Sequence, residues 1–146
     1  GEQAVCVEQM TAKACRKELQ KIRETIGTVT EEPAVFFRIP GGEYNNEVLR
    51  TIYACGSYPV AWSVDSMDWK EYEASELVRQ LLQSCTIRDG EILRFHGEGE
   101  NTGEMVKLLH PRLKEEGYEA ITVSQMVYKD RYRMTTDGRQ IPEKSK

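Results

Sequence analysis

Four side chains that can bind anions or transfer protons lie at or just after the end of short apolar segments: Arg38, Asp65, Asp68 and His96. A histidine beside a carboxylate can act as a general acid, and an Arg–Asp pair can hold a carboxylate or tune a neighbouring group. In an open α/β sheet, ligands bind at the carboxyl ends of the strands. If the apolar segments are parallel strands, these side chains share one rim, and the sequence predicts a site there.

The apolar segments alternate with amphipathic helices along the chain. Strands are predicted at 34–39, 58–64, 91–95 and 120–123. Helices are predicted from Thr11 to Gly27, from Asn45 or Asn46 to Gly56, from Ser75 to Cys85 and from Thr102 to Gly117, because polar caps precede each apolar stripe and glycines follow most of them. Helices alternating with strands indicate parallel strands joined by right-handed crossovers, so the predicted fold class is α/β.

Bulk properties exclude several function classes. The chain has 146 residues, about one domain, with 39% hydrophobic residues and a formal net charge of −4. This charge disfavours nucleic acid as a partner, since phosphate binding favours a basic surface. No apolar run approaches the length of a membrane span, and no secretion signal is recognisable. Residues 128–146 are polar and without periodicity, and we expect an extended or frayed tail there.

Each feature also has a plain structural interpretation. A histidine at a strand end is often structural or simply solvated, and an Arg–Asp pair is often an ordinary salt bridge. An α/β domain without any site is therefore one alternative. The glycine-rich run GEGENTG after His96 is not a phosphate loop, because it lacks the lysine and the spacing of that motif.

Three segments carry a resemblance to a known family. FRIPGGEYN at 37–45 and WSVDSMDW at 62–69 resemble the third and fourth motifs of the polysaccharide deacetylases, the NodB-homology carbohydrate esterases, whose patterns are RxP[Y/G]G and DxxDW. ILRFH at 92–96 resembles the fifth motif. The resemblance covers roughly residues 10–127. It implies the later, C-terminal part of an irregular (β/α) barrel, a partial deacetylase domain at 1–127 and a separate tail at 128–146.

The resemblance implies a function and roles for individual residues. The family consists of metal-dependent N-deacetylases acting on acetylated amino-sugar polymers such as peptidoglycan or chitin. The implied catalytic residues are Arg38, which orients the catalytic base, Asp68, which tunes the acid–base pair, and His96, which protonates the leaving amine. The implied substrate-binding residues are Gly41, whose N–H helps to form the oxyanion site, Tyr44, Asp65 and Trp69, which walls the acetyl pocket. Family habit implies the cell envelope or the extracellular space.

Other positions depart from the family pattern. The first motif, Asp-Asp-Gly, and the second, HxxxH, do not occur in this sequence, so the ligands of a zinc-like divalent metal are not expected among its residues. Arg94 stands where the family usually has an apolar residue, and Gly97 replaces the usual Asp. We therefore expect the 146 residues alone to be inactive. The alternative is a non-catalytic carbohydrate-binding or interaction module derived from a deacetylase.

Overall fold

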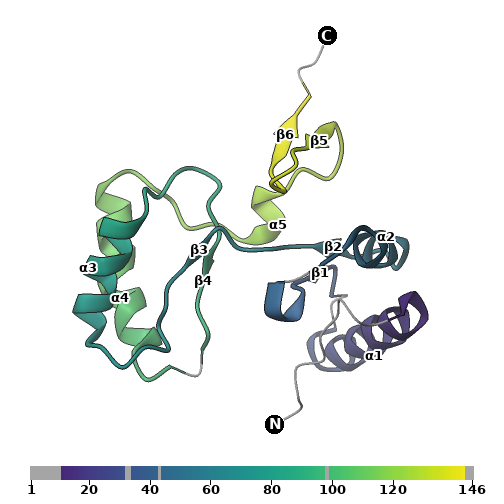
Figure 1. Ribbon diagram of the computed structural model, residues 1–146, viewed down its shortest axis with the longest axis horizontal. Coiled ribbons are helices and arrows are strands. Elements are labelled where there is room, and N and C mark those ends of the chain that lie inside the picture. The colour runs from purple at the N-terminus through teal and green to yellow at the C-terminus, as the bar shows by residue number, and fades with distance from the viewer. Residues whose placement is uncertain (1–10, 32–33, 43, 98, 144–146) are drawn as a thin grey trace. The chain divides into compact units, whose positions relative to one another are not determined.

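The structure is a computed structural model that describes residues 11–31, 34–42, 44–97 and 99–143 (Figure 1). The chain forms two compact units, 1–62 and 63–146. The first unit contains α1 (Ala12–Thr30), β1 (Phe36–Phe37), a 3-10 turn (Pro40–Gly42), α2 (Asn46–Ala54) and β2 (Tyr58–Pro59). The second contains β3 (Val64–Asp65), α3 (Ala74–Ser84), β4 (Leu93–Arg94), α4 (Thr102–Glu115), α5 (Val123–Met126), β5 (Tyr132–Met134) and β6 (Gln140–Pro142).

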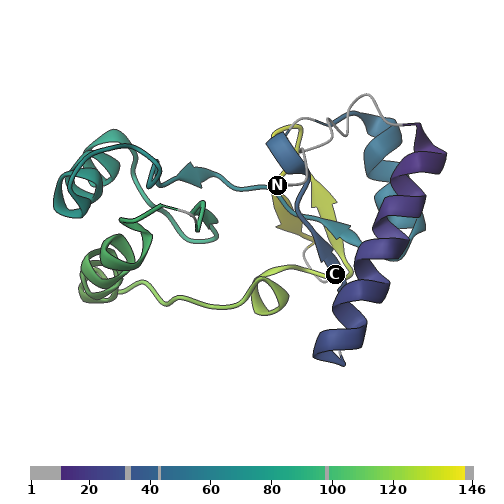
Figure 2. The same cartoon turned by 90° about the horizontal axis from the view of Figure 1, so that it is seen from below.

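In the first unit, two helices pack around one small core. Figure 2 shows α1 and α2 side by side, and the parallel pair β1–β2 matches Phe36 with Tyr58. The buried apolar side chains come from both helices and from the end of the first strand segment: Cys15, Leu19, Ile39, Val48 and Ile52. Cys15 and Leu19 on α1, and Val48 and Ile52 on α2, each stand four residues apart and so share one face of their helix, whose burial stabilises the unit. Ile22 and Ile26, which continue the apolar spacing of α1, are exposed.

The predicted N-caps of these two helices are confirmed. Thr11 Oγ1 accepts the N–H of Ala14 at 3.3 Å, and Asn45 Oδ1 accepts that of Val48 at 2.9 Å. The predicted end of α1 at Gly27 is wrong, because the helix runs on to Thr30. The hydroxyl of Thr30 donates to the Ile26 carbonyl at 2.9 Å, which satisfies one carbonyl of the last turn.

In the second unit, α3 and α4 lie side by side and β3 pairs with β4 in parallel (Figure 1). The register matches Val64 with Leu93 and Asp65 with Arg94. The core of this unit consists of Val64, Ala74, Leu77, Val78, Leu81, Met105 and Leu109. The pairs β1–β2 and β3–β4, whose strands are joined by a helix along the chain, are parallel, as the alternation of helices and strands predicts. Closure of the strands into a barrel stays a prediction.

The segment predicted as one strand at 58–64 changes partner along its length. The N–H of Val60 donates to Phe37 O at 2.9 Å, whereas the N–H of Ser63 donates to Ile92 O at 3.1 Å. The segment therefore contributes β2 to the first unit and β3 to the second. The prediction of one unbroken strand at 58–64 is therefore wrong, because the two ends of this segment pair with different strands.

The starts of α3 and α4 also differ from prediction. Glu73 is the N-cap residue of α3, so Ser75 lies inside the helix. Asn101 is the N-cap residue of α4, and Thr102 is its first helical residue. The Thr102 hydroxyl is used elsewhere, since it donates to Asp68.

The C-terminal part is more ordered than predicted. Residues 119–122 form no strand, and α5 begins at Val123 with a capping box in which Thr122 N–H donates to Gln125 Oε1 at 3.0 Å. Further on, β5 and β6 form an antiparallel hairpin instead of an irregular tail. Its loop contains Asp137–Gly138, a typical turn pair. The domain boundary at residue 127 stays a prediction.

No helix in the described part of the chain is long and apolar enough to cross a membrane.

Candidate functional site

Asp68 is the centre of a hydrogen-bond cluster just beyond the carboxyl end of β3. Its side chain is fully buried, with 0% of its surface exposed. The carboxylate accepts the Nδ1–H of His96 at 2.6 Å and the main-chain N–H of His96 at 3.0 and 3.1 Å. It also accepts the hydroxyl of Ser66 at 3.0 Å and that of Thr102. Within the described residues no buried side-chain polar atom lacks a hydrogen-bond partner.

The parallel register positions this cluster. Because Asp65 lies opposite Arg94, the residues that follow β3 and β4 leave the sheet side by side. The N–H of Ser66 donates to the Arg94 carbonyl at 3.0 Å, and this bond holds together the segments that follow β3 and β4. The loop after His96 then passes close to Asp68: a Cβ on Gly99 would lie 2.6 Å from the Asp68 carbonyl oxygen. Only glycine permits this approach, which brings Thr102 to the carboxylate.

The hydrogen bonds decide the charge of Asp68. Burial by itself raises the pKa of the carboxyl, but hydrogen bonds from Thr102, His96 and Ser66 together outweigh it and hold the pKa well below its usual range. Asp68 is therefore a carboxylate at neutral pH. A carboxylate in this place requires a proton on Nδ1 of His96, and so fixes the orientation of the ring.

The outer side of the His96 ring is also contacted. Arg94 Nη2 lies 2.6 Å from Nε2, and Arg94 Nη1 lies 3.6 Å from Asp65 Oδ2. The indole of Trp69 meets the imidazole edge to face, with ring centroids 6.3 Å apart and planes at 80°. Trp69 is 57% exposed, so it forms a wall that a ligand can reach. The cluster combines a proton-transfer pair, a cation and an aromatic surface.

Of the predicted site residues, Asp65, Asp68, Trp69 and His96 thus meet in the second unit. Arg38, Gly41 and Tyr44 lie in the first unit, and their contribution to the same site stays a prediction. There, the Arg38 guanidinium lies 5.9 Å from the centroid of a Trp62 ring. Gly41 has φ 75°, a left-handed conformation that suits glycine and exposes its backbone, and Tyr44 is 46% exposed.

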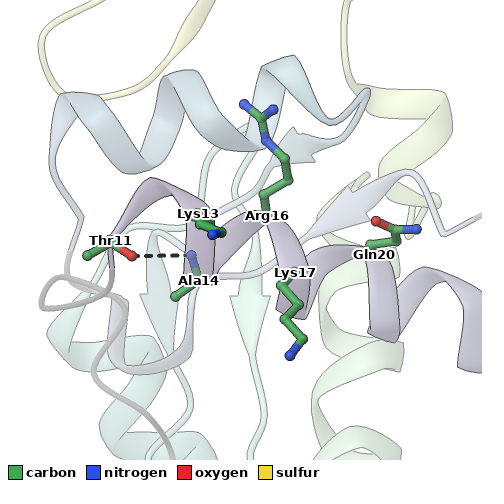
Figure 3. A pocket seen from close by; sticks show the side chains of 6 residues that line it. All are labelled: Thr11, Lys13, Ala14, Arg16, Lys17 and Gln20. Carbon is green, nitrogen blue, oxygen red and sulfur yellow. Dashed lines mark hydrogen bonds between the residues drawn. The ribbon is translucent and has the colours of Figure 1, made fainter.

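An open pocket in the first unit contains none of the predicted site residues. It lies on α1 and is lined by Thr11, Lys13, Ala14, Arg16, Lys17 and Gln20 (Figure 3). Its lining is mainly the solvated polar face of one helix, and the Thr11–Ala14 bond drawn there is the N-cap bond. We assign no function to it.

Comparison with known proteins identifies the family. No model of a protein family matches the chain. The peptidoglycan-N-acetylglucosamine deacetylase of Bacillus cereus is 31% identical over 102 residues, which are 66% of this chain and 46% of that protein. The peptidoglycan-N-acetylglucosamine deacetylase PgdA of Listeria monocytogenes is 28% identical over 121 residues, 81% of this chain and 25% of that protein.

A solved structure agrees with these sequence relatives. A mutant of BA3943 from Bacillus anthracis, described as a CE4 family pseudoenzyme with restored enzymatic activity, matches with a TM-score of 0.78 at 25% identity. The match covers 85% of this chain and 44% of that one. The chain belongs to the polysaccharide deacetylase family. It spans less than half the length of the two curated relatives.

Polysaccharide deacetylases are hydrolases of amide bonds, and the family resemblance implies a divalent metal. Within residues 11–31, 34–42, 44–97 and 99–143, no group of three or more His, Cys, Asp and Glu side chains could hold a metal ion. The described residues therefore do not fit the metal, and no chemical step is assigned to it here. Among the described residues, the groups able to transfer a proton at this site are Asp68 and His96.

Two partners of Asp68 were not expected from the sequence. In the sequence, Ser66 is part of the DxxDW motif without a role of its own, and Thr102 is predicted to be a helix cap. Serine and threonine hydroxyls are frequent in loops, and nothing in the chain indicates which carboxylate they face. Arg94 was noticed as a departure from the motif, but its contact with His96 was not predicted.

Proposed function

We propose that this chain is the part of a polysaccharide N-deacetylase that supplies the proton donor for the leaving amine and one wall of the acetyl pocket. The substrate class is an acetylated amino-sugar polymer such as peptidoglycan or chitin, and the place of action is the cell envelope or the extracellular space. The single observation that carries the proposal is the buried Asp68 carboxylate holding Nδ1 of His96 at 2.6 Å.

The chemistry of amide hydrolysis explains the value of this pair. An amine leaves a tetrahedral intermediate readily only when its nitrogen is protonated, so the reaction needs a positioned acid. A buried carboxylate at Nδ1 orients an imidazole and stabilises the imidazolium that carries the proton on Nε2. Asp68 fills this role because its hydrogen bonds keep it ionised. The indole of Trp69 lies beside the imidazole, with the ring centroids 6.3 Å apart.

Residues of the first unit have supporting roles in this proposal. Arg38 orients the catalytic base, and the N–H of Gly41 donates to the developing oxyanion, as the family motif implies. Tyr44 and Asp65 contact the sugar. In a complete family domain a divalent metal, zinc or a similar ion, would supply Lewis-acid polarisation of the amide carbonyl, and its ligands would come from outside the described residues. Because the described residues do not provide its ligands, we expect no turnover by the 146 residues alone.

A chimera tests the proposal. The part of the Bacillus cereus relative that precedes its matched stretch is joined to this chain, and acetate release from N-acetylchitooligosaccharides is measured with added Zn²⁺. We expect turnover by the chimera and none by this chain alone. The change His96→Gln should lower the rate at least about 100-fold, the usual contribution of a general acid. The matched control is His110→Gln, since His110 is exposed on α4.

Two outcomes contradict the proposal. One is a chimera whose rate is the same with His96→Gln as with His110→Gln. The other is clear acetate release by the 146-residue chain alone, which would contradict the claim that metal ligands are missing from it.

The exposed aromatic rings favour a second candidate, a non-catalytic sugar-binding module. Trp69 is 57% exposed and Tyr44 46%, and both rings can stack on sugars. Titration of the chain with chitin or peptidoglycan fragments, followed by tryptophan fluorescence, tests this. Saturable micromolar binding that Trp69→Ala abolishes, together with an inactive chimera, would replace the catalytic proposal by the binding one.

A further inference from the structure

Both ring nitrogens of His96 are engaged by charged neighbours. Nδ1 lies 2.6 Å from Asp68 Oδ1, and Nε2 lies 2.6 Å from Arg94 Nη2. A guanidinium can only donate hydrogen bonds, so Nε2 must be the acceptor and carry no proton. A carboxylate can only accept, so the proton of the neutral ring lies on Nδ1. The two contacts specify the same tautomer.

Arg94 is itself held in place from the neighbouring strand. Asp65 is its direct partner in the β3–β4 ladder, and their charged groups approach to 3.6 Å. The side chains of Arg94 and Asp65 are each 23% exposed, so this pair is only partly screened by water. The guanidinium thus spans from the Asp65 carboxylate to the imidazole. This arrangement covers the nitrogen that would have to deliver a proton.

We propose that Arg94 is a positioning residue that clamps Nε2 of His96, keeping that nitrogen unprotonated and shielded from solvent. His96 can then deliver a proton to a leaving group only after Arg94 has moved off Nε2. This last consequence rests on the proposed function, whereas the clamp itself does not.

The first test measures the reactivity of Nε2. Diethyl pyrocarbonate acylates an unprotonated, accessible imidazole nitrogen, and mass spectrometry locates the modified histidine. In the 146-residue chain His96 should react slowly and the exposed His110 quickly. Arg94→Leu should increase the rate at which His96 is modified about tenfold. This is the change expected if a hydrogen bond worth about 1.4 kcal/mol maintains the shielded arrangement.

Matched variants separate the clamp from general loosening. Arg94→Lys keeps a donor and should restore slow modification. Arg112→Leu removes an exposed arginine from α4 and should leave His96 unchanged. The rate at the exposed His110 serves as an internal standard for the reagent in every variant, and a thermal unfolding transition like that of the parent chain shows that a variant is folded. Equal His96 rates in the parent chain and in Arg94→Leu would overturn the proposal.

A second readout is taken on the parent chain, and a variant serves only to assign its signals. Imidazole ¹⁵N chemical shifts report which ring nitrogen carries the proton, and His110→Gln assigns the signals of His96. We expect Nδ1 protonated and Nε2 unprotonated at neutral pH. A protonated Nε2 would overturn the clamp. Neither measurement uses a substrate, so failure of the clamp and failure of the deacetylase proposal are distinguishable.

Discussion

His96 contacts Asp68 through both its ring and its backbone. The ring Nδ1 lies 2.6 Å from one carboxylate oxygen, and the main-chain N–H reaches both oxygens at 3.0 and 3.1 Å. The two backbone bonds hold the start of the loop after β4 in place independently of the orientation of the imidazole ring. The ring bond then orients an already anchored side chain. Asp68 is therefore a structural anchor as well as the partner of the proposed acid.

Replacing Asp68 by asparagine tests this anchoring. The variant Asp68→Asn keeps the size of the side chain but removes the charge and one acceptor oxygen, so buried donors lose their partner. We expect the free energy of unfolding to fall by about 1–3 kcal/mol, measured by urea denaturation at pH 7. The exposed Asp89→Asn should change it by less than about 0.5 kcal/mol. Equal effects of the two changes would contradict the anchor.

The lowered pKa of Asp68 predicts a pH dependence. The unfolded chain binds a proton on this carboxyl near pH 4, and the folded chain only at lower pH. The stabilisation from the carboxylate is therefore complete above the unfolded pKa and is lost as pH falls through the folded value.

The comparison of the parent chain with Asp68→Asn isolates this contribution. The difference in unfolding free energy should be constant from pH 7 to about 5 and should narrow below about pH 4. Other carboxyls with lowered pKa, such as Glu91, are common to both proteins and cancel. A difference that stays constant down to pH 3 would show that Asp68 is not the titrating group.

Thr102 should contribute through its hydroxyl. Thr102→Val removes the donor to Asp68 while keeping the branched shape, and we expect a loss of about 1.5–3 kcal/mol, as for a hydrogen bond to a charged group. Thr102→Ser keeps the hydroxyl and should recover most of this loss. Thermal unfolding of the two variants checks it. If serine is as destabilising as valine, packing of the methyl group explains the effect instead.

Replacement by alanine should have different effects on stability at two glycines near the start of α4, Gly99 and Gly103. A Cβ on Gly99 would lie 2.6 Å from a backbone oxygen, so Gly99→Ala requires a backbone shift and should cost about 1–3 kcal/mol. A Cβ on Gly103 meets nothing within 4 Å, and Gly103 lies in the helix. Gly103→Ala should therefore be neutral or stabilise by up to about 1 kcal/mol. Calorimetry of both variants tests the pair.

The amino-acid sequence by itself determined the helices α1 to α4 and the family. Apolar spacing and polar caps placed the start of α1 at Thr11 and that of α2 at Asn45 or Asn46, because a cap bonds to a backbone N–H only three residues away. The order of helices and strands correctly indicated parallel pairing, and three motifs indicated the polysaccharide deacetylases. The ends of elements were less well predicted, as at Gly27, since local bonds of the last turn decide them.

Only the tertiary structure decided which groups meet. The segment 58–64 divides between two strand pairs because one partner strand precedes it in the sequence, at Phe36–Phe37, and the other follows it, at Leu93–Arg94. Thr102 reaches Asp68 across 34 positions of the chain, and Asp68 reaches Nδ1 of His96 across 28 positions. Local spacing fixes contacts within one or two turns of a helix, whereas these contacts depend on the path of the whole unit. The chemistry of His96 is set by contacts of that second kind.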